Sequence, residues 1–130
     1  MPEDSLEEWS EKAGQDFEYA RVGMRQRKNP LYDGVCFHAQ QCAGNYVKAF
    51  LVRHHIAFRK IHDRIELRRL CLQVDSTFSL ITDPLKVLYL YAVDIRYPGI
   101  TATKEDAQRA MEAMKQVRNF VRARLGFKTK

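Results

Sequence analysis

Apolar residues recur at intervals of three and four positions along most of this sequence, and this spacing limits its fold more than any other feature. The spacing is typical of a helix that is buried along one face. Four prolines and six glycines interrupt the 130 residues, so the helices between them can be long. The sequence therefore predicts an all-α protein. Because a chain of this length has room for one core, residues 1–130 are expected to form a single helical domain.

Residues that start helices set most of the predicted bounds. Ser5 and Glu8 have the S-x-x-E spacing of a capping box. Asp83 is a candidate cap that is followed by Pro84 in the first helical position, and Thr103 is a candidate cap of the last helix. The predicted helices span residues 5–24, 35 to 52–54, 63–74, 83–95 and 103–125.

The segments between these helices carry residues that favour turns. Residues 25–34 are polar and contain the turn dipeptide Asp33-Gly34, so they are predicted to form a loop. Residues 54–62 are predicted to form a second loop. Gly126 follows the last apolar residue of the final helix, where a left-handed residue is favoured. These short connections predict an antiparallel up-and-down bundle of four to five helices.

Several classes of protein are excluded by what the sequence lacks. Its three cysteines contain no CxxC pair and are odd in number, which argues against a disulfide framework or a structural zinc site and favours a reducing cytoplasm. No apolar run approaches the roughly 20 residues of a membrane helix, and the acidic N-terminus does not resemble a secretory signal. His54 and His55 are adjacent, so they do not form an i, i+4 metal pair. We expect no metal site and no contact with a membrane.

The charge of the chain is unevenly distributed. The net charge is +6, but residues 1–20 contain seven acids and one base, so the remainder carries +12. This excess permits an anionic partner such as RNA, and it equally permits contacts with the acidic first helix or with that of a second subunit. The basic residues form two clusters, Arg53, Arg59, Lys60, Arg64, Arg68 and Arg69, and then Lys115, Arg118, Arg122, Arg124, Lys128 and Lys130.

The second predicted helix contains the string YDGVCFHAQQCA at residues 32–43, followed by YVKAFL at residues 46–51. This stretch resembles the second helix of HEPN-domain proteins, and the rest of the chain supports the resemblance along its whole length. The supporting features, in order, are Trp9 and Asp16-Phe17, then His62, then Arg96-Tyr97-Pro98, then an alanine-rich last helix.

The resemblance implies a four-to-five-helix bundle that often pairs as a homodimer. It also implies a prokaryotic protein that works beside a minimal nucleotidyltransferase, in a toxin–antitoxin or stress-related module. Two activities are associated with the family. One is nucleotide binding, for which ATP is a possible ligand, and the other is metal-independent cleavage of RNA.

RNA cleavage in the family depends on an arginine followed, after four to six residues, by a histidine. None of the four histidines, His38, His54, His55 and His62, has an arginine at that spacing. A second departure is Gly44-Asn45, where the family often has Glu-Lys. The missing motif favours a role without catalysis, although a divergent ribonuclease that uses His38 or His62 is an alternative. A basic nucleic-acid-binding module without catalysis is another.

Polar residues spaced three and four apart on the second helix form one stripe that could line a cleft. They are His38, Gln41, Asn45 and Lys48. Imidazole, amide and ammonium groups could bind a base edge and a phosphate, and the alternatives are a solvated face or a dimer face. His62 could bind an anion at a helix start or cap the helix, and Arg96 could bind phosphate or balance a helix end. The predicted nucleotide-binding residues are His38, Gln41, Lys48, His62 and Arg96.

Gly44 lies in the middle of the predicted second helix, where glycine is about 1 kcal/mol less favourable than alanine. A close approach by a neighbouring helix or by a ligand would explain it, and so would chance. The sequence as a whole predicts a HEPN-like nucleotide-binding or partner subunit of a minimal nucleotidyltransferase.

Overall fold

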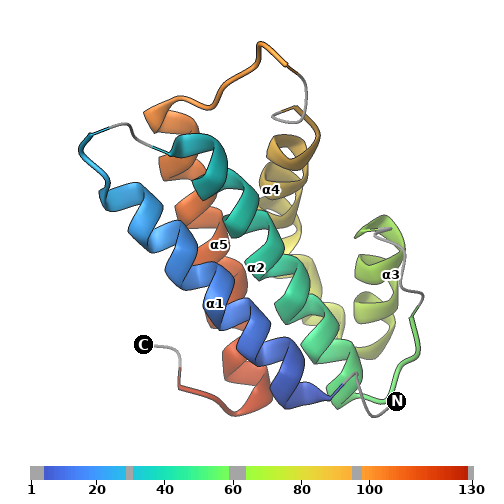
Figure 1. The fold of residues 1–130 in the computed structure, drawn as a ribbon. Helices are drawn as coiled ribbons and strands as arrows, with labels where there is room; N and C mark the ends of the chain where they lie inside the picture. Colours follow the sequence, from blue (N-terminus) through green and yellow to red (C-terminus); the bar gives the residue numbers. More distant parts are fainter. Residues whose placement is uncertain (1–4, 29–30, 59–63, 95–97, 129–130) are drawn as a thin grey trace.

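A computed structural model of the chain describes residues 5–28, 31–58, 64–94 and 98–128 (Figure 1). These residues form five α-helices and one short 3-10 helix, and they contain no strand, so the predicted all-α class is confirmed. The elements are α1 (Leu6–Arg25), α2 (Tyr32–Arg53), α3 (Arg64–Val74), the 3-10 helix η2 (Ser76–Ile81), α4 (Thr82–Asp94) and α5 (Lys104–Leu125).

Helices α1, α2, α4 and α5 form an up-and-down bundle. Helices α1 and α4 run opposite to α2 and α5, and α3 lies on the far side of α2 from α1 (Figure 1). Helix α2 contacts each of the other four α-helices. This central position explains why α2 has a wide apolar stripe in the sequence, as expected for a helix in the middle of a bundle. None of the helices in the described ranges is both long and apolar enough to cross a membrane.

The predicted start of α1 and both predicted ends of α5 are confirmed. The Ser5 side chain accepts a hydrogen bond from the backbone N–H of Glu8, 3.1 Å away. Thr103 and Asp106 form a reciprocal capping box at the start of α5. Gly126 follows α5 with a left-handed φ of 80°, where a side chain would be strained.

The core is built around α2, and its aromatic part lies between α2, η2 and α5. Phe50 of α2 packs against Phe78 of η2 at 4.9 Å between ring centroids, and Phe78 contacts Phe120 of α5 at 5.4 Å. Phe50 and Phe78 are almost completely buried, which stabilises the fold by about 1.5–3 kcal/mol for each side chain. Tyr46 is also buried, and its hydroxyl accepts a hydrogen bond from Arg122 at 3.2 Å.

The predicted loop at residues 25–34 is too long at its C-terminal end. Helix α2 begins at Tyr32, so Asp33 and Gly34 lie in its first turn and not in a loop. The Asp33 carboxylate accepts a hydrogen bond from the backbone N–H of Ala102, 2.6 Å away. An acidic residue is also favourable in the first turn of a helix. Both effects favour helix over the turn that Asp33-Gly34 would form in isolation.

The predicted start of the fourth helix is also wrong. Helix α4 begins at Thr82, directly after η2, so Asp83 is its second residue and not its cap, and Pro84 is its third. The 3-10 helix was not predicted. Asp75 caps it by accepting a hydrogen bond from the backbone N–H of Thr77 at 2.9 Å. This D-x-T pattern is the local signal that could have revealed it.

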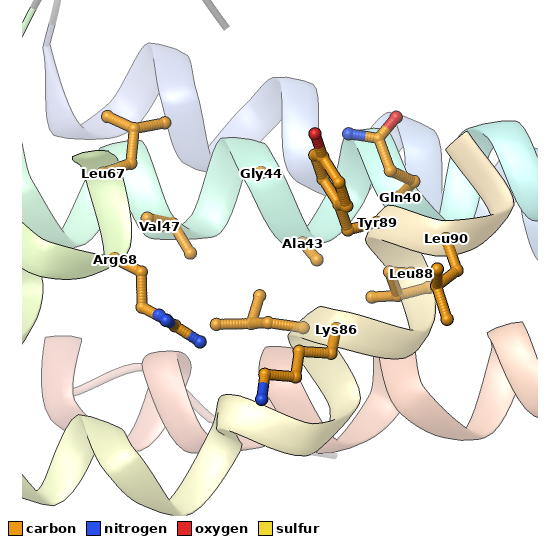
Figure 2. Close-up of a pocket in the computed structure, with 11 residues that line it drawn as sticks. Gln40, Ala43, Gly44, Val47, Leu67, Arg68, Lys86, Leu88, Tyr89 and Leu90 are labelled. Carbon is orange, nitrogen blue, oxygen red and sulfur yellow. The ribbon is translucent and has the colours of Figure 1, made fainter. Parts of the chain in front are cut away.

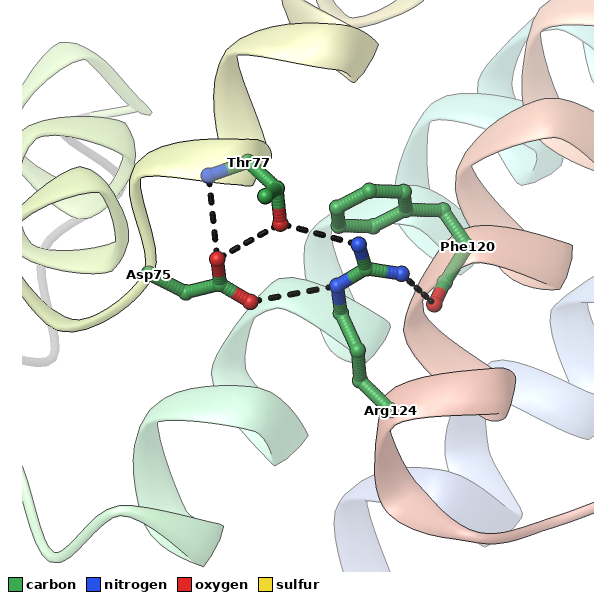
Figure 3. A network of polar contacts seen from close by, with 4 residues as sticks. All are labelled: Asp75, Thr77, Phe120 and Arg124. Atoms are coloured by element: carbon green, nitrogen blue, oxygen red, sulfur yellow. Dashed lines mark hydrogen bonds and ion pairs between the residues drawn. The ribbon is translucent and has the colours of Figure 1, made fainter.

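Arg124 fixes η2 against the last turn of α5 (Figure 3). Its guanidinium donates to Asp75 at 3.1 Å and to Thr77 at 2.8 Å, and lies 3.4 Å from the centroid of the Phe120 ring. These contacts hold the pKa of Asp75 below its usual value, mainly through the hydrogen bonds from Thr77 and then through Arg124. Because η2 joins α3 to α4, Arg124 helps to set the positions of both helices.

Candidate functional site

A cavity of about 340 Å³ lies between α2, α3 and α4 (Figure 2). Small-molecule pockets usually have volumes of about 300–1,000 Å³, so this cavity has room for a small ligand. The side chains around it are mostly apolar. The described lining residues are Gln40, Ala43, Gly44, Val47, Leu67, Arg68, Leu85, Lys86, Leu88, Tyr89 and Leu90.

Helix α2 forms one wall of the cavity. Gln40, Ala43, Gly44 and Val47 follow the i, i+3, i+4, i+7 spacing of one helix face. Ala43 and Gly44 are small, so the middle of this helix face leaves space in the cavity. A Cβ atom added to Gly44 would meet only Nε2 of Gln40, at 3.9 Å, among the described residues within 4 Å. None of the described neighbours therefore requires glycine at this position, and its effect is to leave space in the cavity.

The cavity has cationic groups on one side. Arg68 comes from α3 and Lys86 from α4, and their charged ends lie on the same side of the cavity (Figure 2). None of the described lining residues is acidic. This side of the cavity is therefore suited to an anion such as a phosphate.

Gln40 and Tyr89 lie at another part of the cavity (Figure 2). Tyr89 is 40% exposed and offers an aromatic ring. Gln40 is only 4% exposed, and its Nε2 atom has no hydrogen-bond partner within the described part of the chain. A buried donor without a partner costs about 1–3 kcal/mol. The Gln40 amide therefore places in the cavity wall a donor that makes no hydrogen bond to the described residues.

A second polar cluster lies between α1 and α2. Asp16 of α1 accepts hydrogen bonds from His38 Nδ1 at 2.8 Å and from Asn45 at 3.0 Å. The ring of Tyr19 stacks on His38 at 4.8 Å between centroids. Farther along α2, Lys48 is buried and its ammonium lies 4.9 Å from the centroid of the Trp9 ring. The predicted polar stripe of α2 thus packs mainly against α1.

Three of the predicted nucleotide-binding residues lie outside the lining of the cavity. His38 and Lys48 face α1, Gln41 is partly buried on α2, and none of the three lines the cavity. His62 and Arg96 lie outside the described residues, as does the predicted cap Asp63. The assignment of these five residues stays a prediction.

The sequence did not predict a ligand-binding role for the cavity residues Gln40, Lys86 and Tyr89. In the sequence, Arg68 is only one member of a basic cluster. The one signal that pointed to the cavity was Gly44, a glycine inside a helix that no packing contact explains.

The second basic cluster makes extensive contacts within the fold. Arg118 lies over the ring of Phe17 at 4.4 Å, and Arg122 binds the Tyr46 hydroxyl. Arg124 holds η2 through Asp75 and Thr77. Three of its arginines are thus engaged by the protein itself, which weakens the expectation of a continuous nucleic-acid-binding surface.

The cysteines are not suited to chemistry or to metal binding. All three are buried and free. Burial raises the pKa of Cys36 and of Cys71 to about 12 each, and it also raises the pKa of Cys42. Thiols in such surroundings are poor nucleophiles. Among the residues that the structure describes, no group of three histidine, cysteine or carboxylate side chains could hold a metal ion.

The architecture defines a class of small all-helical proteins in which a central helix of an up-and-down bundle also supports an outer helix. The HEPN domain matches residues 6–124. The chain belongs to the HEPN domain family, which confirms the resemblance of residues 32–51. The crystal structure of an archaeal HEPN homologue is similar, with a TM-score of 0.69 and 23% identity over 93% of this chain and 98% of that chain. No curated protein matches the chain.

Proposed function

We propose that this HEPN-domain protein binds a nucleotide in the cavity between α2, α3 and α4, and that it acts in the cytoplasm as a partner subunit of a minimal nucleotidyltransferase. The observation that carries the proposal is the cavity itself, which combines apolar walls, the Tyr89 ring and the cations Arg68 and Lys86. An aromatic ring can stack on a base and the cations can bind a phosphate. A toxin–antitoxin or stress-related module is the proposed setting.

Thermal shift and calorimetry with ATP, ADP and AMP test nucleotide binding. A ligand that binds the folded state at 100 times its Kd adds about 2.7 kcal/mol to stability. We expect Arg68→Ala and Lys86→Ala to weaken binding, because each removes a cation from the cavity. Lys115→Ala is the matched control, since Lys115 is an exposed cation of α5 outside the cavity. No shift for the wild type at millimolar nucleotide would refute the proposal.

The partnership is tested by the neighbouring gene and by co-expression. If a nucleotidyltransferase reading frame lies beside this gene, the two proteins should co-purify in a fixed ratio. Failure of the co-expressed proteins to associate would refute this part of the proposal.

We also propose a homodimer that buries the exposed side chains of α1 and α2. Tyr19, Val22 and Phe37 are 64%, 55% and 53% exposed, and the rings of Tyr19 and Phe37 both contact the ring of His38. Exposed apolar side chains that lie together are typical of protein–protein contact surfaces. Phe37→Glu should shift the mass measured by light scattering toward that of a monomer. Leu80→Glu, at an exposed leucine of η2, is the control and should leave the mass unchanged.

The alternative activity, RNA cleavage without a metal ion, is supported by one observation. Asp16 binds Nδ1 of His38, which fixes the orientation of the imidazole. Incubation with labelled RNA in the presence of a chelator tests this alternative. Cleavage that His38→Ala abolishes would favour a divergent ribonuclease, and intact RNA would exclude it for that substrate.

A further inference from the structure

The amide of Gln40 is the polar group of the cavity that most needs an explanation. The side chain is 4% exposed, and its Nε2 has no hydrogen-bond partner among the described residues. A methionine or leucine would fit an apolar wall without the cost of an unpaired donor, which is about 1–3 kcal/mol. A ligand atom that accepts a hydrogen bond would recover this cost. The amide therefore indicates a ligand with an acceptor at this position.

The surroundings of Gln40 indicate what kind of group carries that acceptor. Gly44 has no side chain beside Nε2, and Tyr89 of α4 lies close to Gln40 (Figure 2). Tyr89 is 40% exposed, so part of its ring surface is open to a flat group that stacks on it. A nucleobase has both a flat apolar face and acceptor atoms at its edge.

The opposite side of the cavity indicates the size of the anion. Arg68 and Lys86 together carry two positive charges, which match the charge of about −1.5 to −2 on one phosphate monoester. The volume of about 340 Å³ is at the lower end of the range for small-molecule pockets. Both features favour a single phosphate over a triphosphate.

We infer that the cavity binds a nucleoside monophosphate, with the base against Tyr89 and hydrogen-bonded by the Gln40 amide, and with the phosphate at Arg68 and Lys86. This inference rests on the proposed nucleotide site and adds the orientation of the ligand and its phosphate number. Gln40 is the specificity-determining residue, because its amide meets the edge of the base.

Calorimetry with AMP, GMP, CMP, UMP, ATP and ribose 5-phosphate tests the inference. We expect at least one monophosphate to bind as tightly as ATP or more tightly, and ribose 5-phosphate to bind at least tenfold more weakly because it lacks a base. Gln40→Met should weaken monophosphate binding about tenfold, the effect of one lost hydrogen bond. Tyr89→Leu should also weaken binding about tenfold, because the stacking contact is lost.

Gln108→Met is the matched control, since Gln108 is an exposed glutamine of α5 that does not line the cavity. It should leave the affinity unchanged. Thermal unfolding without nucleotide separates binding from structure, because Gln40→Met removes an unpaired buried donor and should keep or raise the Tm. A lower Tm would assign Gln40 a structural role and overturn the inference.

The outcomes distinguish this inference from the proposed function. If nucleotides bind but Gln40→Met binds them as well as the wild type does, the inference fails while the proposed function stands. The inference also fails by itself if ribose 5-phosphate binds as tightly as the best monophosphate. If the wild type binds no nucleotide at all, the proposed function fails and the inference fails with it.

Discussion

Gly44→Ala is expected to make the protein more stable. Gly44 lies inside α2, and alanine at a helix interior is about 1 kcal/mol more favourable than glycine. Nothing in the described surroundings opposes the change, since the new Cβ would contact only Nε2 of Gln40 at 3.9 Å, an ordinary van der Waals distance. The full propensity difference should therefore be retained, and the free energy of unfolding should rise by about 0.5–1 kcal/mol.

The measurement is urea unfolding followed by circular dichroism, with a thermal melt as a second readout. For a chain of 130 residues, a change of 1 kcal/mol corresponds to about 3–4 °C in Tm. Gly23→Ala is the matched control on α1. Its Cβ would lie 2.9 Å from Cγ2 of Val35, too close for real atoms, so it should destabilise the protein by about 1–3 kcal/mol.

Equal destabilisation by the two alanines would refute the reasoning, because it would mean that a neighbour packs against Gly44 as closely as Val35 packs against Gly23. Gly44→Leu extends the test to function. A leucine should fill part of the cavity and weaken nucleotide binding while the helix content stays that of the wild type.

Three further predictions concern polar groups. The backbone N–H of Thr103 holds the pKa of Asp106 below its usual value. The ionised carboxylate therefore stabilises the fold at a pH above the pKa of the unfolded state. This stabilisation is lost as the pH falls through the lower pKa of the folded state. Asp106→Asn should lower stability at neutral pH and flatten the acid limb of the profile below about pH 4; an unchanged limb would contradict this. Asp16→Ala removes two hydrogen bonds to α2 and should lower the free energy of unfolding in urea by about 1–3 kcal/mol. A change near zero would mean that these hydrogen bonds do not stabilise the fold. Because the pKa values of Cys36 and Cys71 are raised to about 12, the native thiols should react slowly with Ellman's reagent and quickly after unfolding, whereas fast native reaction would disagree.

The start of α1 and both ends of α5 could be predicted because their signals are local. Thr103 and Gly126 act within one turn of their own helix, so sequence spacing was sufficient for α5. The prediction for Asp33 was wrong because its carboxylate is used by Ala102, a residue 69 positions away. The prediction for Asp83 was wrong because the preceding turn is already helical and continues directly into α4.

The candidate site was harder to predict because three helices build it. Gln40 and Arg68 are 28 positions apart in the sequence, and only the packing of α3 and α4 on α2 places them around one cavity. The chemistry of the His38 imidazole favours a binding role in the sequence, but its hydrogen bond to Asp16 depends on where α1 lies. Gly44 is the exception, since a glycine inside a helix can be noticed without the fold.

The most direct test of the nucleotide site is the map of backbone amide shifts in the NMR spectrum when AMP is added to the wild type. The cavity between α2, α3 and α4 predicts the largest shifts at residues such as Gly44, Arg68 and Leu88. Shifts that concentrate at His38 and Lys48, on the side of α2 that faces α1, would contradict the cavity as the site.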